Sequence, residues 1–140
     1  MRELDVAEIT EAVKELSIQT NIHLSDDVKK ALREALEKEE SPLGKEILQV
    51  ILDNHDIAEK EKMPICQDTG AAIVFLEVGQ EVHLTGGALE DAVNEGVRQG
   101  YKEAYLRKSM VADPVIERKN TTDNTPAIIY TRIVPGDKVK

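Results

Sequence analysis

A helical half of the chain gives way to an apolar strand within Pro64-Ile65-Cys66-Gln67-Asp68-Thr69-Gly70-Ala71-Ala72-Ile73-Val74-Phe75-Leu76. The first seven residues combine proline, glycine and polar side chains, a composition typical of a loop. The last six form an apolar run of strand-forming residues, which indicates a strand covered on both faces. The sequence's only cysteine lies in this stretch, so we expect a thiol in a loop directly before a strand.

The region before this stretch predicts three helices. Asp5 can cap a first helix that runs to about residue 19, and Ser25 can cap a second. Ser41 followed by Pro42 predicts the start of a third helix, which reaches about residue 58 or beyond. The expected buried side of this third helix consists of Leu43, Ile47, Val50 and Ile51.

The region after the stretch predicts one long helix. Thr85 can cap it, and helical spacing puts one set of apolar residues on a single side: Leu89, Val93, Val97, Tyr101 and Ala104. Gly96 and Gly100 fall near that side. Because glycine is unfavourable inside a helix, the two residues predict a close approach of another backbone or a ligand.

The remaining residues predict a loop and two strands. Asn120–Pro126 is dense in side chains that bond to nearby backbone, which indicates a structured loop. Ala127–Val134 reads as a strand, and Lys138–Lys140 as the opening of another. Helices followed by a mixed strand and helix region give the α+β class. We expect one domain over residues 1–140, truncated at its C-terminal end.

Composition and charge exclude several classes of function. The net charge of -9 and the scarcity of aromatic residues oppose nucleic-acid binding. No segment approaches about 18 consecutive apolar residues, so we expect no membrane span and a cytoplasmic protein. The three histidines, His23, His55 and His83, lack the spacing of a metal site, and each is expected to be solvated or to cap a helix.

The heptapeptide Pro64–Gly70 resembles the first cluster-binding cysteine motif of the class I, iron-sulfur-dependent hydro-lyases, which include class I fumarases and L-tartrate dehydratases. The resemblance extends through the helix containing Ile47–Ile57, through Asn124–Pro126 and through Val134–Lys138. Four segments in the family's order are similar to the N-terminal part of the α subunit or α region. The resemblance implies an enzyme that reversibly hydrates a four-carbon dicarboxylate, fumarate to malate.

The resemblance also implies the site residues and partners. Cys66 would be one of three ligands of a [4Fe-4S] cluster, and the other two are absent from this chain. Gln67 and Asp68 would face the substrate, Asp68 as the catalytic acid group, and Arg107 would clamp a substrate carboxylate. The chain alone would be inactive. It would need the remaining α region and a β subunit or domain, in a homo- or hetero-oligomer.

The residues themselves leave alternatives open. Cys66 can be a small buried apolar residue, Asp68 can bond to the backbone of its own turn, and Arg107 can neutralise a helix end. The substrate can be L-tartrate instead of fumarate, and the catalytic base is not assigned. A non-catalytic reading also fits: an acidic helical module that binds another chain.

Overall fold

The computed structural model describes residues 1–66 and 70–140. Gln67 and Asp68, two of the expected site residues, lie outside the described residues. The chain forms two compact units, one of Met1–Ile18 with Thr69–Lys140 and the other of Gln19–Asp68. Among the described residues, only the first unit contains strands. The α+β class is confirmed.

The first unit pairs its strands in parallel. The pairs are β1 (Arg2–Asp5) with β3 (Val82–Thr85), and β2 (Ile73–Gly79) with β4 (Ile128–Val134). Lys140 exchanges backbone hydrogen bonds with Glu77 on β2, so the predicted opening of a last strand forms an isolated bridge to β2. The sequence did not reveal β1, because four residues form a strand only through pairing with β3, about 80 residues away in the chain.

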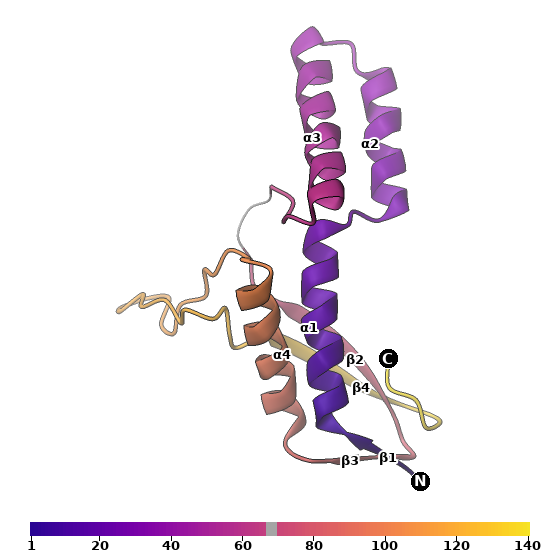
Figure 1. The fold of residues 1–140 in the computed structure, drawn as a ribbon, viewed down its shortest axis with the longest axis vertical. Helices are drawn as coiled ribbons and strands as arrows, with labels where there is room; N and C mark the ends of the chain where they lie inside the picture. The colour runs from indigo at the N-terminus through magenta and orange to yellow at the C-terminus, as the bar shows by residue number, and fades with distance from the viewer. Residues whose placement is uncertain (67–69) are drawn as a thin grey trace. The chain divides into compact units, whose positions relative to one another are not determined.

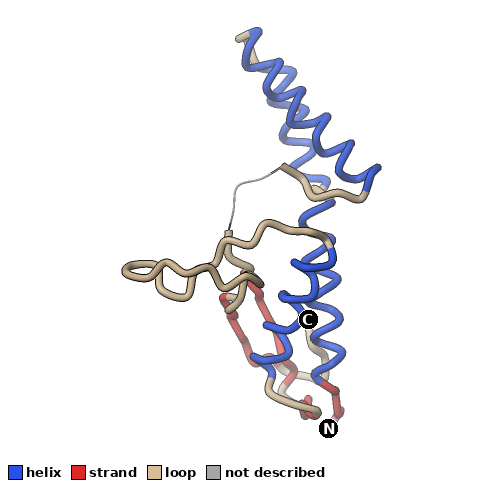
Figure 2. The backbone as a smooth tube through the Cα atoms, turned by 60° about the vertical axis from the view of Figure 1, so that its left-hand side comes forward, coloured by secondary structure: helices blue, strands red, loops and turns tan. Residues whose placement is uncertain are grey.

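Helices cover one face of the β2 and β4 pair. Within this unit, the N-terminal part of α1 (Val6–Ile22) and α4 (Leu89–Glu103) lie on the same side of these strands (Figure 1 and Figure 2). The buried core residues are Leu4, Ile9, Val13, Leu76, Val93 and Val97. The predicted close approach is confirmed. A Cβ on Gly96 would lie 2.6 Å from the carbonyl oxygen of Thr10, and one on Gly100 would lie 2.9 Å from that of Lys14.

Two expectations for this unit are wrong. The helix does not begin after Thr85, which belongs to β3; α4 is preceded by Ala88 at its N-cap. Strand β2 is not covered on both faces, because Phe75 is 75% exposed and stacks on Tyr130 of β4 at a ring separation of 5.2 Å. The apolar run correctly marked a strand, but the cover on its second face depends on tertiary contacts that this unit does not make.

The second unit is a helical hairpin. Helices α2 (Asp26–Lys38) and α3 (Pro42–Glu61) lie side by side (Figure 1), and Ser41 accepts a hydrogen bond from the backbone of Gly44 at the start of α3. The expected buried side of α3 is wrong. Its buried residues are Leu52, His55 and Ala58, whereas those expected to be buried are exposed: Leu43, Ile47, Val50 and Ile51.

The histidines behave differently from one another. His23 is exposed and lies 3.2 Å from Glu59, and His83 is exposed on β3. His55 is buried, so the expectation of a solvated histidine is wrong there. Among the described residues, none of the helices combines the length and apolar character needed to cross a membrane.

Candidate functional site

Cys66 lies on the surface of the second unit, in the loop that follows α3. Its backbone N–H donates to Asn54 Oδ1 at 2.9 Å, and the preceding residue, Ile65, is buried and donates its N–H to the carbonyl of Asn21 at 2.8 Å. The thiol-bearing residue itself is exposed. The alternative of a small buried cysteine is therefore wrong. An anchored backbone with an exposed sulfur suits a ligand to a group that lies outside this unit.

Asn124 holds Gly70, the last residue of the cysteine motif, within the first unit. This side chain is fully buried and donates from Nδ2 to the carbonyl of Gly70 at 3.2 Å. Its Oδ1 accepts from the backbone N–H groups of Ser109, at 2.7 Å, and Met110, at 3.0 Å. Burial raises the pKa of Tyr101, and a hydrogen bond with Asn124 partly opposes this rise. One amide therefore joins the motif's last residue to the segment that carries Arg107.

Arg107 is presented to solvent by a fixed backbone. Helix α4 ends at Glu103, so the alternative of an arginine in the last turn of a helix is wrong. Leu106 is buried and donates its N–H to the carbonyl of Tyr101 at 3.0 Å. The Arg107 side chain is exposed and has no hydrogen bond or ion pair with another described residue. Its guanidinium is thus available to a carboxylate, which it can bond through two parallel hydrogen bonds.

A second arginine of the same unit, Arg98, forms ion pairs within the protein. It donates from Nε to Asp123 Oδ2 at 2.9 Å and also pairs with Glu95. Burial raises the pKa of Asp123, but hydrogen bonds from the backbone and hydroxyl of Thr125, together with Arg98, outweigh it and bring this pKa to about 2. Asp123 therefore stays ionised and fixes the turn that precedes Pro126.

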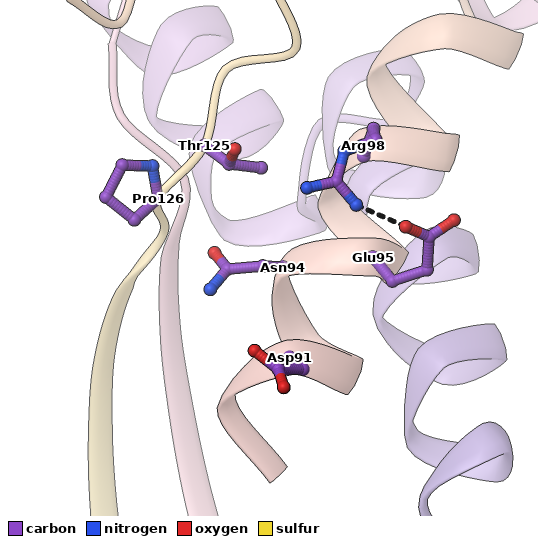
Figure 3. A pocket seen from close by; sticks show the side chains of 6 residues that line it. All are labelled: Asp91, Asn94, Glu95, Arg98, Thr125 and Pro126. Carbon is purple, nitrogen blue, oxygen red and sulfur yellow. Dashed lines mark hydrogen bonds and ion pairs between the residues drawn. The ribbon is translucent and has the colours of Figure 1, made fainter. Parts of the chain in front are cut away.

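These residues border an open pocket of about 450 Å³ (Figure 3). Its polar lining is largely engaged, since Asn94 Oδ1 accepts from the backbone of Ala127 at 2.8 Å and Arg98 is paired with two carboxylates. The lining residues are Asp91, Asn94, Glu95, Arg98, Thr125 and Pro126. Because its arginine, Arg98, is already paired with two carboxylates, this pocket is a weaker candidate for carboxylate binding than the exposed guanidinium of Arg107.

The sequence predicted Cys66 and Arg107 as site residues and did not reveal the side chains that hold their segments in place. Cys66 and Arg107 lie in different units, so each is placed only against its own neighbours. Asn54 and Asn124 were not recognised as the side chains that hold the two segments. The signal for Asn124 was present in the polar loop, because asparagine tolerates the left-handed conformation that it adopts there, with φ of 62°.

Cys66 is the right type of ligand for an iron-sulfur cluster, but one ligand is too few to hold such a cluster. A thiolate on the surface of an anchored loop is the ligand type that such clusters use. However, within residues 1–66 and 70–140 no three His, Cys, Asp or Glu side chains gather so as to hold a metal ion. A cluster bound at Cys66 would therefore need further ligands from outside the described residues.

Comparison with known proteins adds a family match. The family model described as Fumarate hydratase (Fumerase) matches residues 10–140. The putative L(+)-tartrate dehydratase subunit alpha of Methanocaldococcus jannaschii is 39% identical over 104 residues, covering 74% of this chain and 36% of that protein. The L(+)-tartrate dehydratase subunit alpha of Escherichia coli K12 is 31% identical over 134 residues, 94% of this chain and 44% of that protein. The chain thus spans less than half the length of these curated relatives.

Proposed function

Because the chain belongs to the fumarate hydratase family, we propose that it is the N-terminal part of the α region of an iron-sulfur-dependent hydro-lyase. The observation that carries the proposal is the exposed Cys66 on an anchored loop, within the heptapeptide that resembles the family's first cluster-binding cysteine motif. The enzyme would reversibly hydrate a four-carbon dicarboxylate, with fumarate and malate as the pair. We place it in the cytoplasm.

The residues have distinct roles in this proposal. Cys66 is one of three ligands of a [4Fe-4S] cluster, which when bound supplies a Lewis-acidic iron to the substrate's oxygen atoms. Gln67 donates its amide to a substrate carboxylate, and Asp68 acts at the hydroxyl region as the catalytic carboxyl. Arg107 clamps a second carboxylate, a role that its exposed guanidinium supports. Asn124 keeps the Arg107 segment against the end of the cysteine motif.

The chain would act only in an assembly. One thiol cannot hold a four-iron cluster, and three-ligand coordination is what leaves one iron open to substrate. We therefore propose that the other two ligands come from the remaining α region, that a β subunit or domain completes the enzyme, and that this chain alone is inactive. A homo- or hetero-oligomer would result.

A second substrate, L-tartrate, is favoured by one specific observation: the two relatives described above are both named as L(+)-tartrate dehydratase α subunits. The two substrates differ in their hydroxyl groups and share both carboxylates. Arg107 would bind either of them in the same way. Rates measured with fumarate, malate and L-tartrate under the same conditions discriminate between the two activities.

Anaerobic reconstitution tests the proposal. The chain is co-expressed with the remaining α region and the β subunit of a relative, loaded with iron and sulfide, and assayed for cluster absorbance and hydratase activity. Cys66→Ala should lose both signals. Arg107→Lys should keep the cluster and raise KM, because lysine cannot form the two-bond fork, whereas Arg118→Lys, an exposed arginine elsewhere in the loop, should change neither. A Cys66→Ala variant that keeps cluster and activity contradicts the assignment.

A further inference from the structure

Helix α3 carries a second apolar face that nothing in its own unit covers. The side chains of this face recur at alternating steps of four and three residues, with the half-buried Asn54 in the one polar position: Leu43, Ile47, Val50, Asn54 and Ile57. The four apolar members are between 52% and 65% exposed. A 4-3 repeat places side chains along one seam of a helix, the arrangement used when another helix packs against it.

The partner helix in the hairpin does not use this seam. Helix α3 buries Leu52, His55 and Ala58, a different side of the helix, and α2 contains no buried residue. The charged character of α2 leaves its outer side to water. The hairpin thus has three kinds of surface: the buried side of α3, the solvated outer side of α2, and the uncovered apolar seam of α3.

The seam runs directly to the cysteine loop. Asn54 stands between Val50 and Ile57 in the repeat, and its Oδ1 accepts the hydrogen bond from the backbone of Cys66 at 2.9 Å. A polypeptide that covers the seam as far as Ile57 therefore passes the residue that holds the Cys66 loop. From Leu43 to Ile57 the seam is about 21 Å long at 1.5 Å per residue, enough for a partner helix of four turns.

We propose that the α3 seam, defined as Leu43, Ile47, Val50 and Ile57, is the docking surface for an apolar-faced helix of the remaining α region. The inference rests on the proposed function, because that region must also bring cluster ligands to Cys66. The chain spans only 36% and 44% of the two relatives, so more than half of each α subunit is available to supply this helix.

Charge specifies the partner helix further. With Ile47 and Asn54 at the a positions of the repeat, Glu46 and Asp53 occupy the flanking g positions, and both are exposed. The opposite flank holds Ile51, which widens the apolar seam. The occupant should therefore carry Lys or Arg beside its apolar stripe. A second copy of this chain would instead bring its own acidic residues to the interface.

Binding measurements test the docking surface. As the probe we use the portion of the Methanocaldococcus jannaschii α subunit that the match leaves uncovered, and we follow complex formation by light scattering and calorimetry. Ile47→Glu and Val50→Glu should each weaken binding at least tenfold. Lys45→Glu changes the charge in the same direction at the exposed outer f position of the repeat and should leave the affinity unchanged. Circular dichroism verifies that all three variants keep their helices.

Two further measurements separate this inference from the proposed function. Bound probe should slow alkylation of Cys66 by iodoacetamide, and Cys66→Ala should bind the probe with unchanged affinity. A complex that depends on Ile47 but takes up no iron supports the docking surface and contradicts the cluster. Failure of the native chain to bind, equal binding by Ile47→Glu, or unchanged alkylation overturns the inference. So does a homodimer of the native chain that Ile47→Glu dissociates, because the occupant is then a second copy.

Discussion

Replacing Asn124 by alanine removes the side chain that joins three backbone segments. The native amide is fully buried and makes hydrogen bonds with Gly70, Ser109 and Met110, of which the first lies 54 residues away in the sequence. Alanine leaves two N–H groups and one carbonyl without these partners. We expect the variant to be strongly destabilised and the Arg107 segment to separate from the end of the cysteine motif.

The magnitude follows from two contributions. Each partly buried backbone group that loses its partner costs about 1 kcal/mol, which gives roughly 3 kcal/mol for the three. Asn124 also has a φ of 62°, where alanine is strained by about 1 kcal/mol relative to a residue that tolerates this region. The expected loss is therefore roughly 4 kcal/mol, a large part of the 5 to 15 kcal/mol by which domains are typically stable.

Urea unfolding followed by circular dichroism measures the loss, and two variants isolate its causes. Asn124→Gly loses the same hydrogen bonds without the strain, so it should be less destabilised than Asn124→Ala by about 1 kcal/mol. Asn120→Ala is the matched control, because Asn120 makes two hydrogen bonds in the same loop but is exposed, so water replaces them. Equal costs for Asn124→Ala and Asn120→Ala would refute the reasoning.

Two further predictions concern the packing and ionisation of the first unit. Gly96→Ala should destabilise the protein by about 1–3 kcal/mol, because the new Cβ would lie 2.6 Å from the carbonyl oxygen of Thr10. Gly87→Ala, whose Cβ would meet its nearest neighbour at 3.4 Å, should be nearly neutral in the same unfolding assay. Asp123 has a pKa lowered from 3.8 to about 2, so its stabilisation is present above pH 4 and is lost as the pH falls through 2. Asp123→Asn should therefore cost up to about 2 kcal/mol at neutral pH and flatten the dependence of stability on pH between 4 and 2; an unchanged slope would contradict the assigned pKa.

Local signals in the sequence were sufficient for the helices and for the loop around the cysteine. Capping residues and apolar spacing gave α1, α2 and α3 close to their observed bounds, because those features act within a few residues. The same local reasoning misplaced the start of α4 at Thr85. This residue instead belongs to β3, where it pairs with Asp5 of β1. A hydroxyl residue before an apolar repeat has the local pattern of a helix cap even when, as for Thr85, it belongs to a strand that pairs with a distant segment.

The site was only partly visible in the sequence, since its supports act across long separations. Cys66 and Arg107 were proposed from residue type and resemblance, and their exposure is compatible with the proposed roles. The contact between Asn124 and Gly70 joins residues that no periodicity relates. Asn54, which holds the cysteine loop, lies in a helix whose pattern draws attention to its apolar residues instead.

Residues that were expected to be buried but are exposed lie on two apolar faces of the structure. One is the α3 seam, and the other is the face of β2 and β4 that exposes Phe75 and Tyr130. Both elements have the pattern of parts covered on two sides, and strands in parallel sheets are normally buried on both faces. The apolar spacing of these elements thus describes a more covered state than the described residues reach by themselves. If a partner polypeptide covers Ile47 and Phe75, the expected burial is reached in the assembly, so Ile47→Glu should impair assembly while leaving this chain folded.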